Sequence, residues 1–351
     1  MNNSCEQATA MHNVRRLSVD KRTSRRKENL ERAAAYRKRS EICFERRANK
    51  QHDQETLDAI AQVVSENTDF ATLWNFRREV LQAMHPDAAV AGAASNGDAI
   101  GLARKAACAA EFQLTQECLA ANPKSYPVWY HRQWVLTWGR CAWQWPVELK
   151  LTSKLLALDD RNFHCWTYRR FVVQTAGITA DAELGFSTSK IEANFSNYSA
   201  WHHRSKLLPQ IHETGGTDAA TLRGVLKEEL QLVRNAFFTA PEDSSAWFYH
   251  RWLLAQLRPT GPAQVAPEEY EGLVREELSM SEELLELEPE CKWVLAATAY
   301  LHNRLGEHLA VRGEAGVNVE RSAYAEKLRE LNRVDAMRAN YYADMGAAVP
   351  T

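Results

Sequence analysis

The residues best placed to do chemistry are one lysine and one histidine, each close to the start of a repeated motif. Lys124 lies five residues before Trp129, and His164 lies two residues before Trp166. The pattern described below places both in turns that open a helix, where free N–H groups and a partial positive charge favour anions. Together they would form a small anion-binding rim. From the chemistry alone, an exposed lysine and a capping histidine are the simpler interpretation, so both interpretations stay open.

A tryptophan-anchored motif that recurs along the chain predicts the elements that carry these residues. Its five clear copies are centred on Trp74, Trp129, Trp166, Trp201 and Trp247. Three residues after the first four tryptophans stand Arg77, Arg132, Arg169 and Arg204, and His250 takes that place in the fifth copy. An apolar residue follows seven residues after each tryptophan. Offsets of three and seven fall on one side of an α-helix, so each copy contains a helix with a buried stripe.

A second amphipathic stretch lies upstream of each turn, which makes the repeating unit a helical hairpin. We therefore predict an all-α fold, an α-α superhelix in which the hairpins stack as a solenoid. Residues 51–345 would form it, with about five clear repeats and one or two degenerate ones, including one around Trp293. Residues 1–50 would be a basic, partly helical arm. Segments 88–100, 209–220 and 258–266 are predicted to be surface loops between hairpins.

Repetition separates structural residues from candidate site residues. A solenoid needs the same packing device in every repeat, whereas a chemical site needs its residues once. The recurring tryptophans and arginines are therefore assigned to structure, with each arginine crossing to a neighbouring carboxylate or a helix-end carbonyl. Lys124 and His164 break the pattern, because no other copy has a lysine or histidine at those two positions.

Composition narrows the possible classes of function. With 45% hydrophobic and 25% charged residues, the chain is neither disordered as a whole nor fibrous. No apolar run is long enough to span a membrane, and no secretory signal opens the sequence. Seven scattered cysteines without metal-ligand spacing predict reduced thiols in a cytoplasmic protein that holds no metal itself. The basic stretch over residues 15–50 is interpreted as a solvated helix rather than a nucleic-acid site.

Several stretches resemble the repeats of protein prenyltransferase α-subunits, among them NPKSYPVWYHR, RNFHCWTYRRF and NFSNYSAWHHRSKLLPQ. Within that family the chain is similar to the branch of geranylgeranyltransferase type II, which modifies Rab GTPases. The resemblance runs from about residue 69 to about residue 254. It implies a heterodimer in which this chain wraps a β-subunit that holds the catalytic Zn²⁺ and the lipid pocket. The reaction would transfer a geranylgeranyl group from geranylgeranyl diphosphate to C-terminal cysteines of a Rab GTPase presented by a Rab escort protein.

The resemblance also implies roles for three residues. Lys124 and Tyr126 in NPKSY, and His164 in NFHCW, match the family residues that face the isoprenoid diphosphate. Lys124 and His164 would be catalytic, and Tyr126 would bind the diphosphate at the subunit interface. Charge builds up on the leaving diphosphate as its bond to carbon stretches, so cationic or N–H donors placed there stabilise the transition state.

Two alternatives from other classes are compared with this interpretation. One is the α-subunit shared by farnesyltransferase and geranylgeranyltransferase type I, which act on CaaX proteins. In that branch a glutamine follows the motif tyrosine and holds the substrate carboxylate, whereas this chain has Pro127. The other is a non-catalytic helical-repeat scaffold, against which the joint presence of Lys124, Tyr126 and His164 argues. We expect no immunoglobulin-like or leucine-rich-repeat module, and His12 by itself defines no zinc site.

Overall fold

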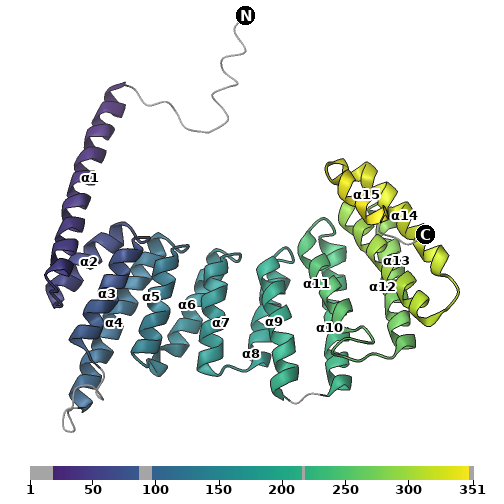
Figure 1. Ribbon diagram of the computed structural model, residues 1–351, viewed down its shortest axis with the longest axis horizontal. Helices are drawn as coiled ribbons and strands as arrows, with labels where there is room; N and C mark the ends of the chain where they lie inside the picture. The colour runs from purple at the N-terminus through teal and green to yellow at the C-terminus, as the bar shows by residue number, and fades with distance from the viewer. Residues whose placement is uncertain (1–18, 87–96, 216–217, 348–351) are drawn as a thin grey trace, which may run out of the picture. The chain divides into compact units, whose positions relative to one another are not determined.

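The computed structural model describes residues 19–86, 97–215 and 218–347, which form helices without a β-strand (Figure 1). This confirms the predicted all-α class. The chain divides into two compact units, Met1–Glu148 and Leu149–Thr351, with the boundary inside helix α6. His12 lies outside the described residues.

The first unit contains two helical hairpins and one long preceding helix. Its helices are α1 (Val19–Ala48), α2 (Gln54–Glu66), α3 (Ala71–Met84), α4 (Gly97–Ala121), α5 (Tyr126–Trp138), the short 3-10 helix η2 (Ala142–Gln144) and the start of α6 (Trp145–Leu158). Helix α2 pairs with α3 and α4 pairs with α5, while α2 packs on α4 and α3 packs on α5. First helices thus stack on first helices and second on second, which is the arrangement of a solenoid.

Helix α1 covers the segment predicted to be a basic arm. Residues 23–35 are exposed, and the helix contacts α2 through its later turns, where Ser40 and Cys43 are buried. Ion pairs of Arg39 with Glu66 and of Arg47 with Glu79 fix this end to α2 and α3. The basic character of α1 therefore has a partly structural use at its C-terminal end.

The second unit continues the same plan. It contains α7 (Phe163–Ala176), α8 (Ala180–Ala193), α9 (Tyr198–Gly215), α10 (Ala219–Thr239), α11 (Ser244–Gln256), α12 (Pro267–Leu287), α13 (Lys292–Arg312), α14 (Val317–Val334), η3 (Ala336–Arg338) and α15 (Ala339–Ala347). Hairpins form from α8 with α9, α10 with α11, and α12 with α13. The second helices α7, α9, α11 and α13 pack on one another in that order.

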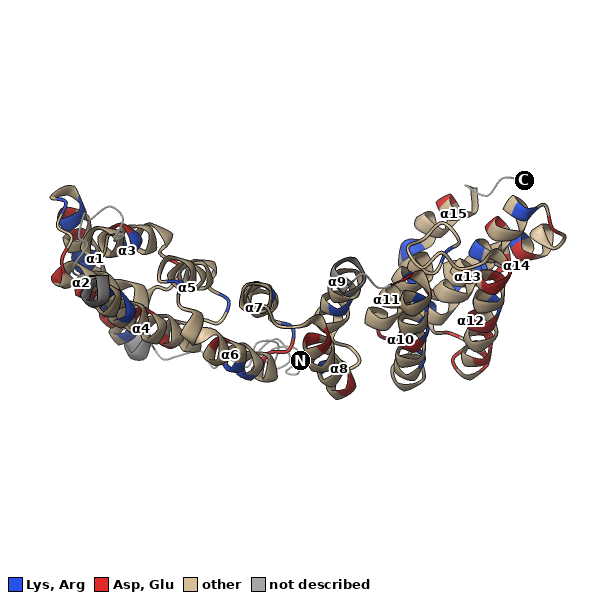
Figure 2. Cartoon of the chain, turned by 90° about the horizontal axis from the view of Figure 1, so that it is seen from below, with Lys and Arg blue, Asp and Glu red and all other residues tan. Residues whose placement is uncertain are grey.

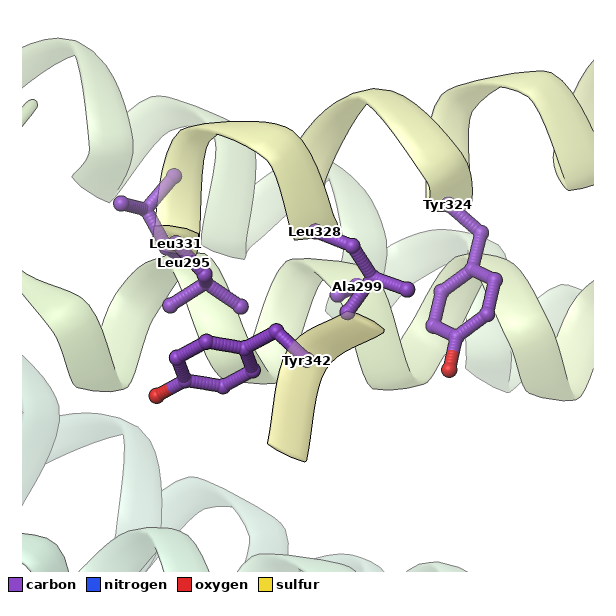
Figure 3. Packing of buried hydrophobic residues seen from close by; sticks show 6 residues of the cluster. All are labelled: Leu295, Ala299, Tyr324, Leu328, Leu331 and Tyr342. Atoms are coloured by element: carbon purple, nitrogen blue, oxygen red, sulfur yellow. The ribbon is translucent and has the colours of Figure 1, made fainter. Parts of the chain in front are cut away.

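The last three helices close the second unit with a small apolar core (Figure 3). It consists of six buried side chains from α13, α14 and α15, namely Leu295, Ala299, Tyr324, Leu328, Leu331 and Tyr342. The hydroxyl of Tyr342 donates a 2.8 Å hydrogen bond to Asp335, so its polar end is satisfied while its ring is buried. These helices extend the stack beyond the five clear repeats.

Every repeat tryptophan fixes the turn that precedes its helix. The indole N–H donates to the carbonyl oxygen six residues earlier, over 2.8–2.9 Å, in the pairs Trp74–Thr68, Trp129–Pro123, Trp166–Asp160, Trp201–Phe195 and Trp247–Pro241. All five rings are at most 5% exposed. The tryptophan therefore fills the core and also satisfies a turn carbonyl that would otherwise be left without a partner.

The arginine three residues after each tryptophan joins successive hairpins. The buried pairs are Arg77–Glu111, Arg132–Glu148, Arg169–Glu183 and Arg204–Glu229. Each glutamate lies on the first helix of the next hairpin. The same arginines donate through Nη1 to the carbonyl oxygens of Leu57, Phe112, Leu149 and Leu184, each twenty residues earlier. His250, which takes the arginine position in the fifth repeat, contacts Glu277 of α12 at 3.0 Å.

Two of the three predicted loops differ from the structure. Helix α4 already begins at Gly97, inside the predicted loop 88–100, and residues 87–96 are outside the described part of the chain. Helix α9 continues through Pro209 to Gly215, although proline removes one hydrogen bond from a helix interior. The helix continues past the proline because Leu207 and Leu208 before it are buried, and their packing in the core outweighs the lost hydrogen bond. Residues 258–266 do form a loop between α11 and α12.

Candidate functional site

Lys124 lies in the turn between α4 and α5, and its backbone is tightly held. Its N–H donates to Oδ1 of Asn122 at 3.2 Å, and the adjacent Ser125 donates its hydroxyl to the carbonyl of Thr68 at 3.0 Å. The indole N–H of Trp129 donates a hydrogen bond to the carbonyl oxygen of Pro123. The side chain of Lys124 is exposed. A rigid turn therefore carries an exposed ammonium group at the start of a helix, an arrangement that favours anions.

Tyr126 and Pro127 follow as the first two residues of α5. Proline is well accommodated there, because the first N–H groups of a helix have no intrahelical partner. The ring of Tyr126 is 67% exposed, and that of Tyr130 one turn later is 59% exposed. The structure thus brings Lys124 and Tyr126 together at one helix start, with aromatic surface beside the cation.

His164 is the second residue of α7 and, unlike Lys124, is buried, with 8% of its surface exposed. The helix cap is Asn162, whose Oδ1 accepts from the N–H groups of His164 and Cys165. The capping role considered for the histidine therefore belongs to the asparagine two residues earlier. The imidazole lies against the ring of Phe163, with centroids 3.9 Å apart, and Phe163 itself is 55% exposed.

The predicted rim joins residues from the two compact units. Lys124 and Tyr126 belong to the unit Met1–Glu148, and His164 belongs to the unit Leu149–Thr351. Each residue is at the start of a second helix, as the repeat pattern predicts. That the three residues meet at one anion stays a prediction.

In the first four repeats an asparagine or aspartate seven residues before the tryptophan shapes the turn, whereas the fifth repeat has Ala240 at that position. The side-chain oxygens of Asn67, Asn122, Asp159 and Asn194 each accept the N–H two residues later. Several of these turns are also joined to the next one. Asn194 donates to Asp160 at 2.7 Å, and Arg161 donates to the carbonyl of Ser196 at 2.6 Å. The signal was present as an Asn or Asp at a constant offset, and such residues favour turns by bonding nearby backbone.

A buried carboxylate supports helix α5, which begins at Tyr126 directly after the turn of Lys124. Glu111 of α4 accepts from Arg77 at 2.6 and 2.7 Å and contacts Nε2 of His131, on α5, at 2.9 Å. Burial by itself would raise the pKa of Glu111. The hydrogen bonds and positive charge of Arg77 and His131 have the larger, opposite effect and lower this pKa to about 2. Burial lowers the pKa of His131, against the opposing effect of Glu111. The carboxylate therefore ties three helices, α3, α4 and α5, into one block.

Within the ranges that the structure describes, no group of three or more His, Cys, Asp or Glu side chains is arranged to hold a metal ion. Six cysteines there are buried free thiols, namely Cys43, Cys108, Cys118, Cys141, Cys165 and Cys291. None of the described helices combines the length and the apolar character needed to cross a bilayer.

Known proteins share this architecture and much of the sequence. The protein prenyltransferase alpha subunit repeat family matches residues 108–139, 145–176, 180–211 and 226–257. The geranylgeranyl transferase type-2 subunit alpha of Dictyostelium discoideum is 34% identical over 341 residues, covering 95% of this chain and 99% of that protein. The proteins of the same name from Rattus norvegicus and Homo sapiens are 42% identical over 252 and 247 residues, covering 70% of this chain.

Coverage differs among these relatives. The chain spans about two fifths of the length of the two mammalian proteins, of which 41% is matched. A solved structure titled Candida albicans protein geranylgeranyltransferase-I complexed with GGPP superposes with a TM-score of 0.66 over 90% of each chain, at 18% identity, and thereby supports the α-α superhelix as the fold. The near-complete match to the Dictyostelium protein, together with the matched repeats, shows that this chain belongs to the family of geranylgeranyl transferase type-2 alpha subunits.

Proposed function

We propose that this chain is the α-subunit of Rab geranylgeranyltransferase. Together with a zinc-bearing β-subunit, it would transfer the geranylgeranyl group of geranylgeranyl diphosphate to C-terminal cysteines of Rab GTPases that a Rab escort protein presents. The observation that carries the proposal is the 34% identity across 99% of the Dictyostelium relative, whose name is that of this subunit. Lys124, Tyr126 and His164, for which the sequence resemblance implies contact with the diphosphate, support the proposal further.

In the proposed reaction this chain acts on the leaving group. A substrate cysteine sulfur bonds to the first carbon of the isoprenoid while the carbon–oxygen bond to diphosphate breaks, and the electron pair leaves with the diphosphate. Lys124 would meet that growing charge with its ammonium group, at the open N-terminus of α5. Tyr126 would donate its hydroxyl to a diphosphate oxygen, and His164 would approach the same group from the start of α7. The zinc ion would be supplied by the β-subunit.

Co-purification tests the identity of the complex. The tagged full-length chain is recovered from its own cells, and the associated proteins are identified and assayed with geranylgeranyl diphosphate. We expect a β-subunit whose complex modifies a Rab with a double-cysteine tail only when an escort protein is added. A complex that modifies CaaX peptides instead, or a chain recovered without any prenyltransferase β-subunit, would refute the proposal.

Replacing Lys124 tests the role of this chain in the chemistry. Loss of one preplaced donor to a developing anion typically lowers kcat by about 10²-fold, so Lys124→Ala should reduce turnover while the heterodimer still assembles. Lys124→Arg, which keeps the charge, should recover part of the activity. Lys154→Ala is the matched control, because Lys154 is also exposed but lies on α6, the first helix of its hairpin. Turnover of this variant should be unchanged. Normal turnover in Lys124→Ala, or failure to assemble, would remove the proposed role.

The CaaX-specific alternative differs at one residue of this site. Pro127 has no amide side chain and no N–H with which to hold a substrate carboxylate, and it occupies the second position of α5. A complex that depends on a fixed C-terminal tetrapeptide would need another residue for that contact. This favours a substrate whose position is set by a separate escort protein.

A further inference from the structure

A small pocket lies in the second unit, at the C-terminal end of α13. The loop that follows α11, the first turns of α12 and the last turns of α13 enclose about 250 Å³. Its walls combine apolar surface from Pro259, Pro267 and Tyr270 with the polar side chains of Arg258, Arg304 and His308. This volume is slightly below the range of about 300–1,000 Å³ that is usual for ligand pockets, so it suits a ligand of a few heavy atoms.

The charges around the pocket leave one guanidinium without a counter-ion. Figure 2 shows acidic residues, in red, along α12, and Arg312 of α13 is paired with one acidic residue of that helix, Glu268, at 2.8 Å. Arg304 is paired with Glu307 on its own helix. Among the described residues, no carboxylate pairs with Arg258, whose guanidinium lies near the hydroxyl groups of Tyr270 and Tyr300. These neutral tyrosines accompany the positive charge without neutralising it.

Two further side-chain nitrogens in this pocket have no hydrogen-bond partner among the described residues. Nε of Arg304 and Nε2 of His308 are both buried and make no hydrogen bond. The imidazole of His308 stands edge-on to the ring of Tyr270, with centroids 5.3 Å apart, which fixes its orientation. Buried polar atoms in proteins are almost always hydrogen-bonded, and two unsatisfied ones beside an unpaired cation indicate that the pocket takes a ligand.

We propose that this pocket binds the carboxylate of a small organic acid whose short apolar group lies against Tyr270 and the prolines. A planar guanidinium fork matches a carboxylate, and His308 is placed to contribute a second nitrogen. A single uncompensated charge suits a monoanion, and the carboxylate of Glu307, which also lines the pocket and pairs with Arg304, disfavours a more highly charged anion such as phosphate. The source could be a free acid or the C-terminal residue of a polypeptide, because both present the same chemistry. This inference does not depend on the proposed prenyltransferase role.

Binding of defined probes to the full-length chain tests the proposal. Hexanoate represents a free acid, N-acetyl-leucine represents a polypeptide end, and their amides are isosteric controls without the charge. Calorimetry should show that at least one acid binds about tenfold or more tightly than its amide. Hexanoate binding would indicate a free acid, and binding of N-acetyl-leucine alone would indicate a polypeptide C-terminus. Equal affinity for acid and amide, no acid binding, or tighter binding of inorganic phosphate would overturn the assignment.

Substitutions locate the binding in this pocket. Arg258→Met and His308→Phe should each weaken acid binding by about tenfold or more, since each removes a donor aimed at the carboxylate. Arg275→Met is the matched control, because Arg275 is on α12 but pairs only with Glu271 along the same helix. If circular dichroism shows that Arg258→Met does not fold, the affinity of His308→Phe and the comparison of acid with amide still decide whether the pocket binds a carboxylate. An unchanged affinity in His308→Phe, or an equal loss in Arg275→Met, would refute the site.

Discussion

The buried ion pair between Arg77 and Glu111 offers a test in which a second substitution should repair the first. Their side chains are 6% and 2% exposed, and the two hydrogen bonds between them are 2.6 and 2.7 Å long. Glu111→Gln keeps the size of the side chain but leaves a buried guanidinium without a counter-charge. Breaking such a pair from one side costs about 3–5 kcal/mol of folding free energy. In a unit of this size that corresponds to a fall in melting temperature of roughly 6–20 °C.

The double variant separates the loss of the pair from the burial of an unpaired charge. In Arg77→Met/Glu111→Gln no charge is left unpaired, and the glutamine oxygen can still accept from His131. We therefore expect it to be more stable than Glu111→Gln alone, by about 2 kcal/mol, because uncharged replacements of buried pairs are often nearly neutral. Glu79→Gln, which breaks an exposed pair with Arg47, is the matched control and should cost about 0–1 kcal/mol.

Urea denaturation followed by circular dichroism measures these differences, and hydrogen exchange of amides in α2 to α5 assigns them to the first unit. A cost below about 1 kcal/mol for Glu111→Gln, or additive effects of the two substitutions, would show that the pair does not stabilise the fold in this way.

Acid should destabilise the buried group of Arg77, Glu111 and His131 in two stages. Unfolded histidine takes up a proton near pH 6.5, but burial lowers the pKa of His131 in the folded state, so stability declines as the pH falls below that value. Glu111 has a pKa near 2 when folded and about 4.5 when unfolded, so its contribution is complete above pH 4.5 and is lost toward pH 2. Denaturation at several pH values should show both stages. The second stage should be smaller in Glu111→Gln, because that variant lacks the Glu111 contribution while other carboxylates with lowered pKa, such as Asp53, remain. A second stage of unchanged size in that variant would contradict the assignment.

Two further predictions concern packing. A Cβ on Gly139 would lie 2.2 Å from the sulfur of Cys108 and 2.6 Å from that of Cys141, both fully buried, so Gly139→Ala should lower the unfolding free energy by about 1–3 kcal/mol. Gly101→Ala, where nothing lies within 4 Å, should be neutral or stabilising, and equal effects at the two glycines would contradict this. Trp166→Ala should cost about 3–5 kcal/mol in denaturation experiments, because a buried ring and its turn hydrogen bond are lost together; a cost below 1 kcal/mol would argue against a core role.

The sequence predicts the hairpins well because their signals are local. The spacing from Trp166 to Arg169 and Val173 places all three on one side of a helix, and helical periodicity alone fixes which side is buried. The start of each second helix, and with it the position of Lys124 and His164, follows from the same spacing. Proline and glycine were less reliable guides, since α9 runs through Pro209 where tertiary packing outweighs the local cost.

The tertiary structure decides which residues meet across repeats and which side chains are reachable. The four repeat arginines find their glutamates 34, 16, 14 and 25 residues later, so no constant offset in the sequence could have identified them. Lys124 and His164 occupy similar positions in the repeat, yet the first is exposed and the second is buried beside Phe163. The exposure of a side chain depends on neighbours from other turns and helices, and the periodicity within one helix does not identify those neighbours.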